Sequence, residues 1–254
     1  MRLSLQTRIE SAAVLARRGM LRPVRPDRLM RAGLAFYRWG PTPATACVVN
    51  AVTRPGRTAM IDSEGPVTWR DLDRRTNALA RGFAELGLES GERIGILCRN
   101  GIPLVESVFA STKLGAHALP LNTSFSAAEL RSVLERERPR VLVHDEEFAS
   151  SVGDASPRAT KRVVAGEALA SLRDVHPGSP LAPPPEEGRI VILTSGTTGA
   201  PKGARIARAT GLEPLAWFLS VVPIDAGSTC LIPAPLFHAH GLGQLTIASA
   251  LGCT

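Results

Sequence analysis

The chain has 254 residues, of which 44% are hydrophobic and 21% are charged, and its formal net charge is +7. A hydrophobic share of this size supports a packed core and argues against a disordered chain. Arginine carries the positive charge, but aromatic residues make up only 4% and are not interleaved with it, which argues against a nucleic-acid-binding protein.

Two features of the sequence favour a cytoplasmic protein. The cysteines are far apart and form no C-x-x-C pair, which favours reduced thiols over disulfides or a metal site. The amino terminus lacks the apolar core of a signal peptide, and no apolar run approaches the length of about 18 residues that a membrane span needs. We therefore expect no transmembrane helix. The four cysteines are Cys47, Cys98, Cys230 and Cys253.

The sequence pattern of residues 1–41 predicts a basic helical extension. An apolar stripe over residues 3–20 predicts an amphipathic helix, and a second helix is predicted from a cap at Asp27 to Gly40. A basic amphipathic helix is suited to peripheral contact with a membrane, and packing against the body of the protein is the alternative. The stripe of the first helix consists of Leu5, Ile9, Ala12, Ala13, Ala16 and Met20.

Residues 42–176 predict a first α/β subdomain, because strand and helix patterns alternate along them. The helix that begins at Thr68 carries an apolar stripe over residues 72–86, and Ser126 and Glu129 form a capping box. This alternation indicates a mostly parallel sheet with helices on both faces. The predicted strands are 58–62, 67–68, 94–98, 116–121, 141–143 and 162–164, and the predicted helices begin at Pro43, Thr68, Pro103 and Ser126.

Residues 177–188 predict a linker, because they hold five prolines and few apolar residues. Residues 189–254 then predict the start of a second α/β subdomain. The elements predicted there are a strand at 190–193, a helix around 212–221, a strand at 230–232 and an apolar helix at 238–251.

The segment from Thr194 to Gly203 has the composition of a phosphate-binding loop. It holds three glycines, three threonines, a serine and a lysine directly after an apolar run. Glycine lets backbone N–H groups approach an anion, hydroxyl groups add donors, and lysine supplies a mobile positive charge. The spacing fits neither G-x-x-x-x-G-K-[ST] nor G-x-G-x-x-G. We therefore predict binding of a nucleoside triphosphate, with a flexible surface loop as the alternative.

Two motifs resemble signatures of the AMP-forming acyl-CoA synthetase superfamily, which includes peptide-synthetase adenylation domains and beetle luciferases. Residues 194–203 resemble its phosphate-loop signature, and residues 235–241 resemble its next signature, P-x-F-H-x-x-G. Weaker agreement upstream extends the likeness to about residues 40–254. The resemblance implies the amino-terminal part of the adenylate-forming α/β fold, with mostly parallel sheets flanked by helices and an incomplete carboxy terminus.

The resemblance implies that ATP and a carboxylic acid, expected to be a fatty acid, give an acyl-adenylate and pyrophosphate, and that coenzyme A then takes the acyl group. Thr194 matches the family position whose hydroxyl helps to hold Mg²⁺. Lys202 matches a catalytic position as well as a phosphate-binding one. The residues implied to hold the nucleotide are Thr194, Ser195, Gly196, Thr197, Thr198, Gly199 and Lys202.

Three histidines deserve separate interpretations. His238 matches the family position at the mouth of the acyl tunnel, where it would position the reacting carboxylate, and a helix-capping role is the alternative. His240 matches no family role. His144 lies at a predicted strand end beside acidic residues, and we expect it to be solvated rather than to act as an acid or base.

The family's adenine-binding segment, magnesium-binding glutamate, ribose-binding aspartate, hinge and carboxy-terminal lysine all match positions after residue 254. We therefore expect a truncated fatty-acid–CoA ligase that is inactive alone and needs a carboxy-terminal complement. Two alternatives stay open, namely a catalytically silent module that binds nucleotide or acyl ligands, and a fragment of a peptide-synthetase adenylation domain.

Overall fold

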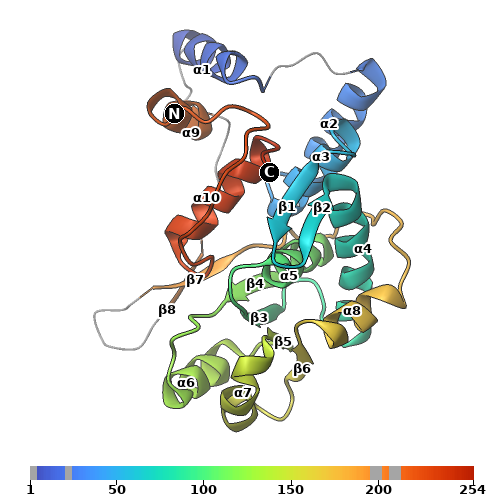
Figure 1. Cartoon of the computed structure of the whole chain (residues 1–254), viewed down its shortest axis with the longest axis vertical. Coiled ribbons are helices and arrows are strands. Elements are labelled where there is room, and N and C mark those ends of the chain that lie inside the picture. The colour runs from blue at the N-terminus through green and yellow to red at the C-terminus, as the bar shows by residue number, and fades with distance from the viewer. Residues whose placement is uncertain (1–4, 21–24, 195–201, 206–212) are drawn as a thin grey trace.

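The structure is a computed structural model and describes residues 5–20, 25–194, 202–205 and 213–254. Figure 1 shows a sheet with flanking helices toward one end of the long axis, and α1, α2 and α9 at the other end. Among the described residues, no helix combines the length and the apolar character needed to cross a membrane.

The order of helices and strands follows the predicted alternation closely. The helices are α1 (Leu5–Arg17), α2 (Pro26–Trp39), α3 (Pro43–Thr53), α4 (Trp69–Glu85), α5 (Ile102–Leu114), α6 (Ala127–Glu137), α7 (Ala149–Ala155), α8 (Glu167–Asp174), α9 (Glu213–Val221) and α10 (Ala239–Ala250), with a 3₁₀ turn at Glu146–Phe148. The strands are β1 (Thr58–Asp62), β2 (Gly65–Thr68), β3 (Arg93–Leu97), β4 (His117–Pro120), β5 (Val141–His144), β6 (Lys161–Val164), β7 (Val191–Thr194) and β8 (Lys202–Arg205).

The central sheet has the strand order β4-β3-β5-β6, and its three strand pairs are all parallel. Successive side chains of a strand point to opposite faces. Ile94 and Ile96 accordingly pack with α4, α5 and α8 in one buried cluster, whereas Leu142 packs with α6 and α7 in another. The predicted parallel sheet with helices on both faces is confirmed.

Helix starts agree with the sequence where a side chain can cap them. Thr42 Oγ1 accepts a hydrogen bond from the Thr45 N–H at 3.3 Å. Both hydrogen bonds of the predicted capping box between Ser126 and Glu129 are present. The predicted cap at Asp27 is wrong, because α2 begins at Pro26, whose fixed φ suits the first helical position.

The helix predicted over residues 3–20 is present as α1, but it buries a different face. Ile9 is 61% exposed, whereas Leu15 is buried in a cluster with α9. Arg18 secures this contact, because its Nε donates to the Leu219 carbonyl at 3.1 Å. The larger side chains of Val14 and Leu15 thus displace the alanine-rich stripe from the interface. Packing against the body of the protein, the alternative to membrane contact, is confirmed for α1.

The strand predicted at 230–232 is absent. The Cys230 N–H donates to the Thr254 carbonyl, and the Thr254 N–H donates to the Ser228 carbonyl, at 2.8 and 2.9 Å. These two bonds pair single residues and do not form a ladder, so the segment stays irregular. A short apolar run is typical of other segments as well as of strands, so it does not identify a strand by itself. In this segment Leu231 is 89% exposed.

The first turn of α10 lies unusually close to the preceding segment at Gly241. A Cβ atom on this residue would lie 2.4 Å from the Pro235 carbonyl oxygen and 2.7 Å from that of Ala234. On the same helix, a Cβ atom on Gly243 would meet nothing within 4 Å. Only a glycine at position 241 therefore allows the backbone to approach so closely.

A buried polar cluster joins α5 to α4. The ammonium group of Lys113, whose side chain is fully buried, donates to Asp73 Oδ1 at 2.6 Å, Thr76 Oγ1 at 2.8 Å and Asn77 Oδ1 at 2.7 Å. A buried charge is tolerated only when it is paired and hydrogen-bonded. This cluster therefore fixes the position of α5 along α4.

We expect Asp73→Ala to lower the free energy of unfolding by about 3–5 kcal/mol, because it leaves the buried Lys113 charge without its carboxylate. Urea denaturation measures the change. Asp154→Ala is the matched control, since Asp154 is exposed, and we expect a change within about 0.5 kcal/mol. Equal effects of the two substitutions would contradict a structural role for the cluster.

We expect Gly241→Ala to destabilise the fold by about 1–3 kcal/mol, because the added methyl group overpacks the turn before α10. Gly243→Ala is expected to be neutral or to stabilise by up to about 1 kcal/mol through helix propensity. The two unfolding curves, recorded side by side, check the prediction. A Gly241→Ala curve that matches the parent would show that the approach is not tight.

Candidate functional site

Two segments that carry candidate residues lie at the carboxyl edge of the central sheet. Ile190 forms a parallel bridge with Ala118, and the Ala118 N–H donates to the Arg189 carbonyl at 2.8 Å. β7 thus follows a segment that runs parallel to β4. In open α/β sheets, ligands bind beyond the carboxyl ends of the strands. β7 ends with Thr194 at such an edge.

The predicted phosphate loop begins at the end of β7 and ends at β8. These strands are antiparallel, and Thr194 pairs in register with Lys202, so the two ends of the loop meet across the hairpin. The sequence pattern does not predict β8, which places Lys202 in a strand. The predicted residues Ser195, Gly196, Thr197, Thr198 and Gly199 lie outside the described residues.

His238 lies at the N-cap position of α10, but its side chain makes no capping hydrogen bond. The imidazole is exposed and its ring centroid lies 4.5 Å from that of Phe237. The helix-capping alternative is therefore wrong for this side chain. An exposed imidazole at the start of a helix is available to a ligand, as the functional interpretation requires.

Asn100 is a site residue that the sequence reasoning misses. It follows β3, and its Nδ2 donates to the Ala234 carbonyl at 2.9 Å while its Oδ1 accepts from the Leu236 N–H at 2.8 Å. The amide thereby holds the segment that precedes His238 at the carboxyl end of β3. Asn100 comes three residues after the end of the buried strand β3, and an amide side chain at the carboxyl end of a strand is a signal that could have identified it.

His144, the last residue of β5, is buried and not solvated as predicted. His144 is only 3% exposed, and its Nδ1 lies 3.0 Å from the Asp145 carbonyl oxygen. The expectation of a solvated histidine is wrong, because β5 lies between β3 and β6 and its last residue is still paired with both. Nearby, Arg99 makes two hydrogen bonds to Glu147 and lowers the pKa of that carboxyl.

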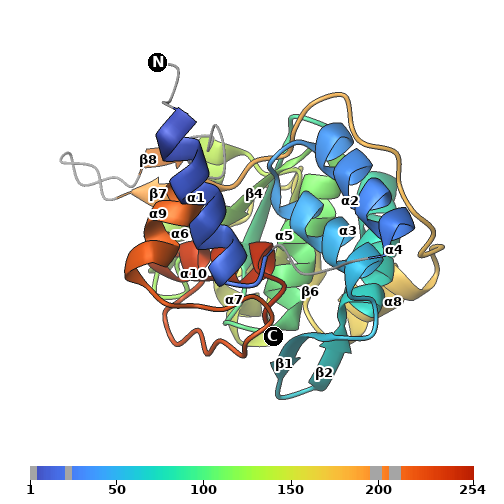
Figure 2. The ribbon, with the colours of Figure 1, turned by 90° about the horizontal axis from the view of Figure 1, so that it is seen from above.

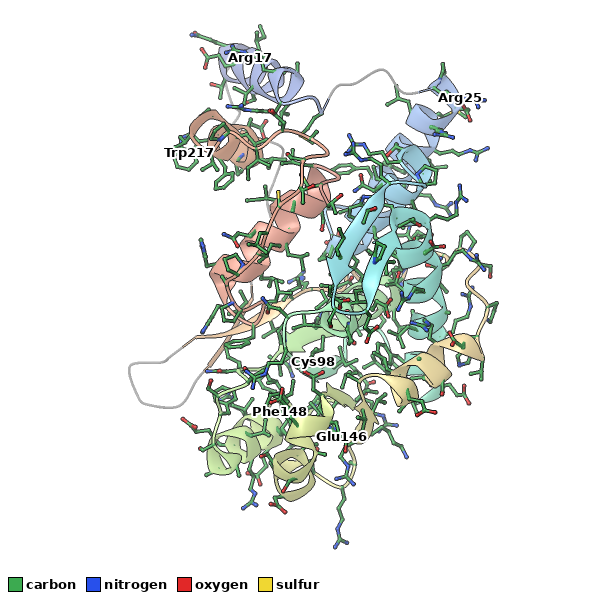
Figure 3. The ribbon with its side chains drawn as sticks, in the orientation of Figure 1. Arg17, Arg25, Cys98, Glu146, Phe148 and Trp217 are labelled. Carbon is green, nitrogen blue, oxygen red and sulfur yellow. The ribbon has the colours of Figure 1, made fainter. Side chains whose placement is uncertain are left out.

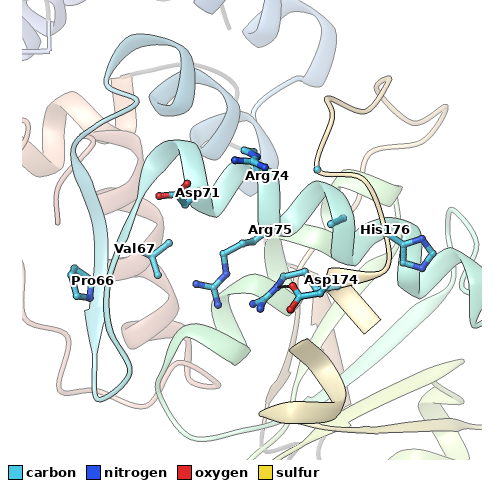
Figure 4. Close-up of a pocket in the computed structure, with 10 residues that line it drawn as sticks. Pro66, Val67, Asp71, Arg74, Arg75, Asp174 and His176 are labelled. Atoms are coloured by element: carbon cyan, nitrogen blue, oxygen red, sulfur yellow. Dashed lines mark hydrogen bonds and ion pairs between the residues drawn. The ribbon is translucent and has the colours of Figure 1, made fainter. Parts of the chain in front are cut away.

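A pocket of about 560 Å³ lies apart from these residues, between β2, α4 and α8 (Figure 4). Arg75 and Arg173, which line it, form ion pairs with the buried Glu106 at 2.5 and 3.6 Å. Burial raises the pKa of the Glu106 carboxyl, although both guanidinium groups act to lower it. Arg173 also pairs with Asp174. Arg75 and Arg173 are thus paired with carboxylates of the protein itself. None of the predicted site residues lines the pocket.

Carboxylate, histidine and cysteine side chains are the groups that would hold a resident metal ion. Within the described part of the chain, no group of three or more such residues is arranged to hold a metal ion. Magnesium bound with a nucleotide takes few protein ligands and keeps phosphate oxygens and waters. A magnesium ion bound in this way needs no such group, and the assignment of Thr194 to it stays a prediction.

Comparison with known proteins agrees with this geometry. Residues 48–254 match the family described as AMP-binding enzyme. A feruloyl-CoA synthase of Amycolatopsis sp. is 31% identical over 197 residues, which are 78% of this chain and 40% of that protein. The chain thus spans about two-fifths of the length of this relative.

Solved structures show the same fold. A putative long-chain-fatty-acid CoA ligase from Rhodopseudomonas palustris superposes with a TM-score of 0.72 and 29% identity, covering 84% of this chain and 56% of that one. An anthranilate CoA ligase in complex with anthranoyl-AMP gives a TM-score of 0.72 and 25% identity, covering 84% and 43%. With its central parallel sheet and its match over residues 48–254, the chain belongs to the AMP-binding enzyme family.

Proposed function

We propose that the chain binds the triphosphate of ATP through residues 194–202 and contributes to AMP-forming activation of a carboxylic acid for transfer to coenzyme A. The observation that carries the proposal is the connection from β7 to β8, in which a glycine- and hydroxyl-rich segment follows a strand beside β4 and ends at Lys202. The chain spans about two-fifths of the curated relative, and the proposed reaction also uses the segments beyond that share.

The proposed chemistry is attack of the acid's carboxylate oxygen on the α-phosphorus, with pyrophosphate as the leaving group. Two anions must approach each other, so the protein mainly positions them and neutralises charge. Lys202 supplies a positive charge to the leaving phosphates, and the glycine N–H groups supply donors. Magnesium, held by the phosphates and the Thr194 hydroxyl, would supply further charge neutralisation when bound.

The acid is proposed to lie beside His238. The imidazole is exposed at the start of α10, and Asn100 fixes the backbone before it through the bonds to residues 234 and 236. An orienting contact of this kind raises the rate only when its geometry is held closely. We assign His238 the role of placing the carboxylate and Asn100 that of a positioning residue.

A fatty acid is the proposed substrate class. The putative long-chain-fatty-acid CoA ligase, at 29% identity, supports this choice. The feruloyl-CoA synthase and the anthranilate CoA ligase make an aromatic acid the competing class. Acid-dependent exchange of pyrophosphate into ATP, measured with a panel of both classes, distinguishes them.

Lys202→Ala is expected to weaken MgATP binding about ten- to a hundredfold, because it removes a charge-assisted contact. Calorimetric titration of the 254-residue chain measures this. Lys161→Ala is the matched control, since Lys161 is exposed on β6, and its dissociation constant should equal that of the parent. The same affinity for parent and Lys202→Ala would refute the phosphate-loop assignment.

In an enzyme of the relatives' length, His238→Ala should slow acid-dependent pyrophosphate exchange by roughly ten- to a hundredfold and leave ATP affinity within about twofold. Asn100→Ala should reproduce part of this loss. His176→Ala is the control, because His176 lies beside Glu85 in the pocket of Figure 4. A loss of ATP affinity that parallels the loss of exchange would contradict a role confined to the acid.

A further inference from the structure

The helix α2 exposes a broad apolar surface. It packs on α3 through a narrow stripe, in which Ala32, Ala35 and Trp39 are buried. Five larger side chains remain 49–87% exposed, and at about 100° per residue they fall on one continuous arc of the helix. This surface, which we call the α2 arc, consists of Leu29, Met30, Leu34, Phe36 and Tyr37.

Two arginines lie beside the α2 arc. Arg31 and Arg38 are exposed and border the arc on one side. Residues 1–41 contain nine arginines against Glu10 and Asp27, a net charge of +7 that equals that of the whole chain. The remaining residues therefore carry as many acidic as basic groups. The excess positive charge of the chain is therefore carried by residues 1–41, which include α2.

A second apolar patch lies at the same end of the molecule. On α9, Trp217 and Val221 are 72% and 68% exposed. Figure 3 shows Arg17, Arg25 and Trp217 at the upper end of the molecule, and Figure 2 looks down on that end, with α1 and α2 toward the viewer. Apolar side chains and arginines are thus presented together on protruding helices.

We propose that this end of the molecule docks on the surface of an anionic lipid bilayer through the α2 arc. The apolar side chains enter the boundary between headgroups and acyl chains, and Arg31 and Arg38 contact lipid phosphates. With 14 residues, α2 is about 21 Å long and does not cross a hydrocarbon layer of about 30 Å. The contact is therefore interfacial.

Charge selects the bilayer over other occupants. A second copy of the chain would bring the same net charge of +7 to the contact, and the two ends would repel each other. Nucleic acid offers phosphates but no apolar phase for Leu34 or Met30. An anionic membrane supplies both. Membrane contact by residues 3–20 is one of the two interpretations that the sequence leaves open. Leu15 is buried against α9, and the surface proposed here lies on α2 instead.

Vesicle flotation of the 254-residue chain tests the proposal. We expect binding to vesicles of equimolar phosphatidylglycerol and phosphatidylcholine, and much weaker binding to pure phosphatidylcholine. Leu34→Asp should reduce binding about tenfold or more, because it puts a charged side chain where the proposal places an apolar one in the bilayer. Val175→Asp is the matched control, since Val175 is 74% exposed directly after α8, away from this end, and it should bind as the parent does.

A separate pair of variants tests how much the arginines contribute to vesicle binding. Arg31→Gln combined with Arg38→Gln should lower affinity about fivefold per arginine at low salt, and Arg158→Gln should not. If Leu34→Asp does not fold, as judged by its melting curve, Tyr37→Ser replaces it, because Tyr37 is 87% exposed.

Two results would overturn the proposal. One is that vesicle binding is unchanged both in Leu34→Asp (or its replacement Tyr37→Ser) and in the variant that combines Arg31→Gln with Arg38→Gln. The other is absence of vesicle binding together with a concentration-dependent dimer that Leu34→Asp abolishes, which would assign the arc to a second copy.

Discussion

The strands of the central sheet are parallel, so they all end at one edge, and this shared direction decides where the chain can present polar groups to a ligand. Ligands meet unpaired backbone groups and loop side chains only at such an edge. Asn100 turns the edge into a candidate site, because its amide ties residues 234–236 to the end of β3. The segment that carries His238 is thereby held at the end of β3, although the two lie more than 130 residues apart in sequence.

A ligand-binding edge keeps its geometry only when the layers beneath it do not slide. Apolar clusters on both faces of the sheet resist separation, but apolar contacts are not directional. The Lys113 cluster adds direction, because moving α5 along α4 would break bonds to three side chains and leave a buried charge unpaired. Gly241 allows α10 to lie close to residues 234–235, where a side chain would meet two carbonyl oxygens.

Local patterns predict most of the fold, and interactions distant in sequence explain the failures. Capping boxes and buried strands depend on neighbouring residues, so Ser126 and β3 are predictable. The face that α1 buries depends on α9, roughly two hundred residues later, and the burial of His144 depends on pairing with two other strands. The phosphate-loop composition and the P-x-F-H-x-x-G motif identify candidate residues from sequence, whereas the role of Asn100 requires knowing which carbonyl and N–H groups it meets.

The two amino-terminal helices show why amphipathic character alone does not identify a membrane-binding surface. Both are basic and amphipathic, but α1 buries Leu15 in the protein, whereas α2 buries Ala32, Ala35 and Trp39 and leaves five other large apolar side chains in solvent. A long-chain acid gains about 0.8 kcal/mol per methylene group on entering lipid, so most of it resides in membranes. An acid-activating enzyme that docks through the α2 arc would meet such a substrate at its highest local concentration. Under this proposal, the exposed apolar residues of α2 bring the enzyme to its substrate, although they weaken its solubility. They would do so without any contact with the phosphate loop.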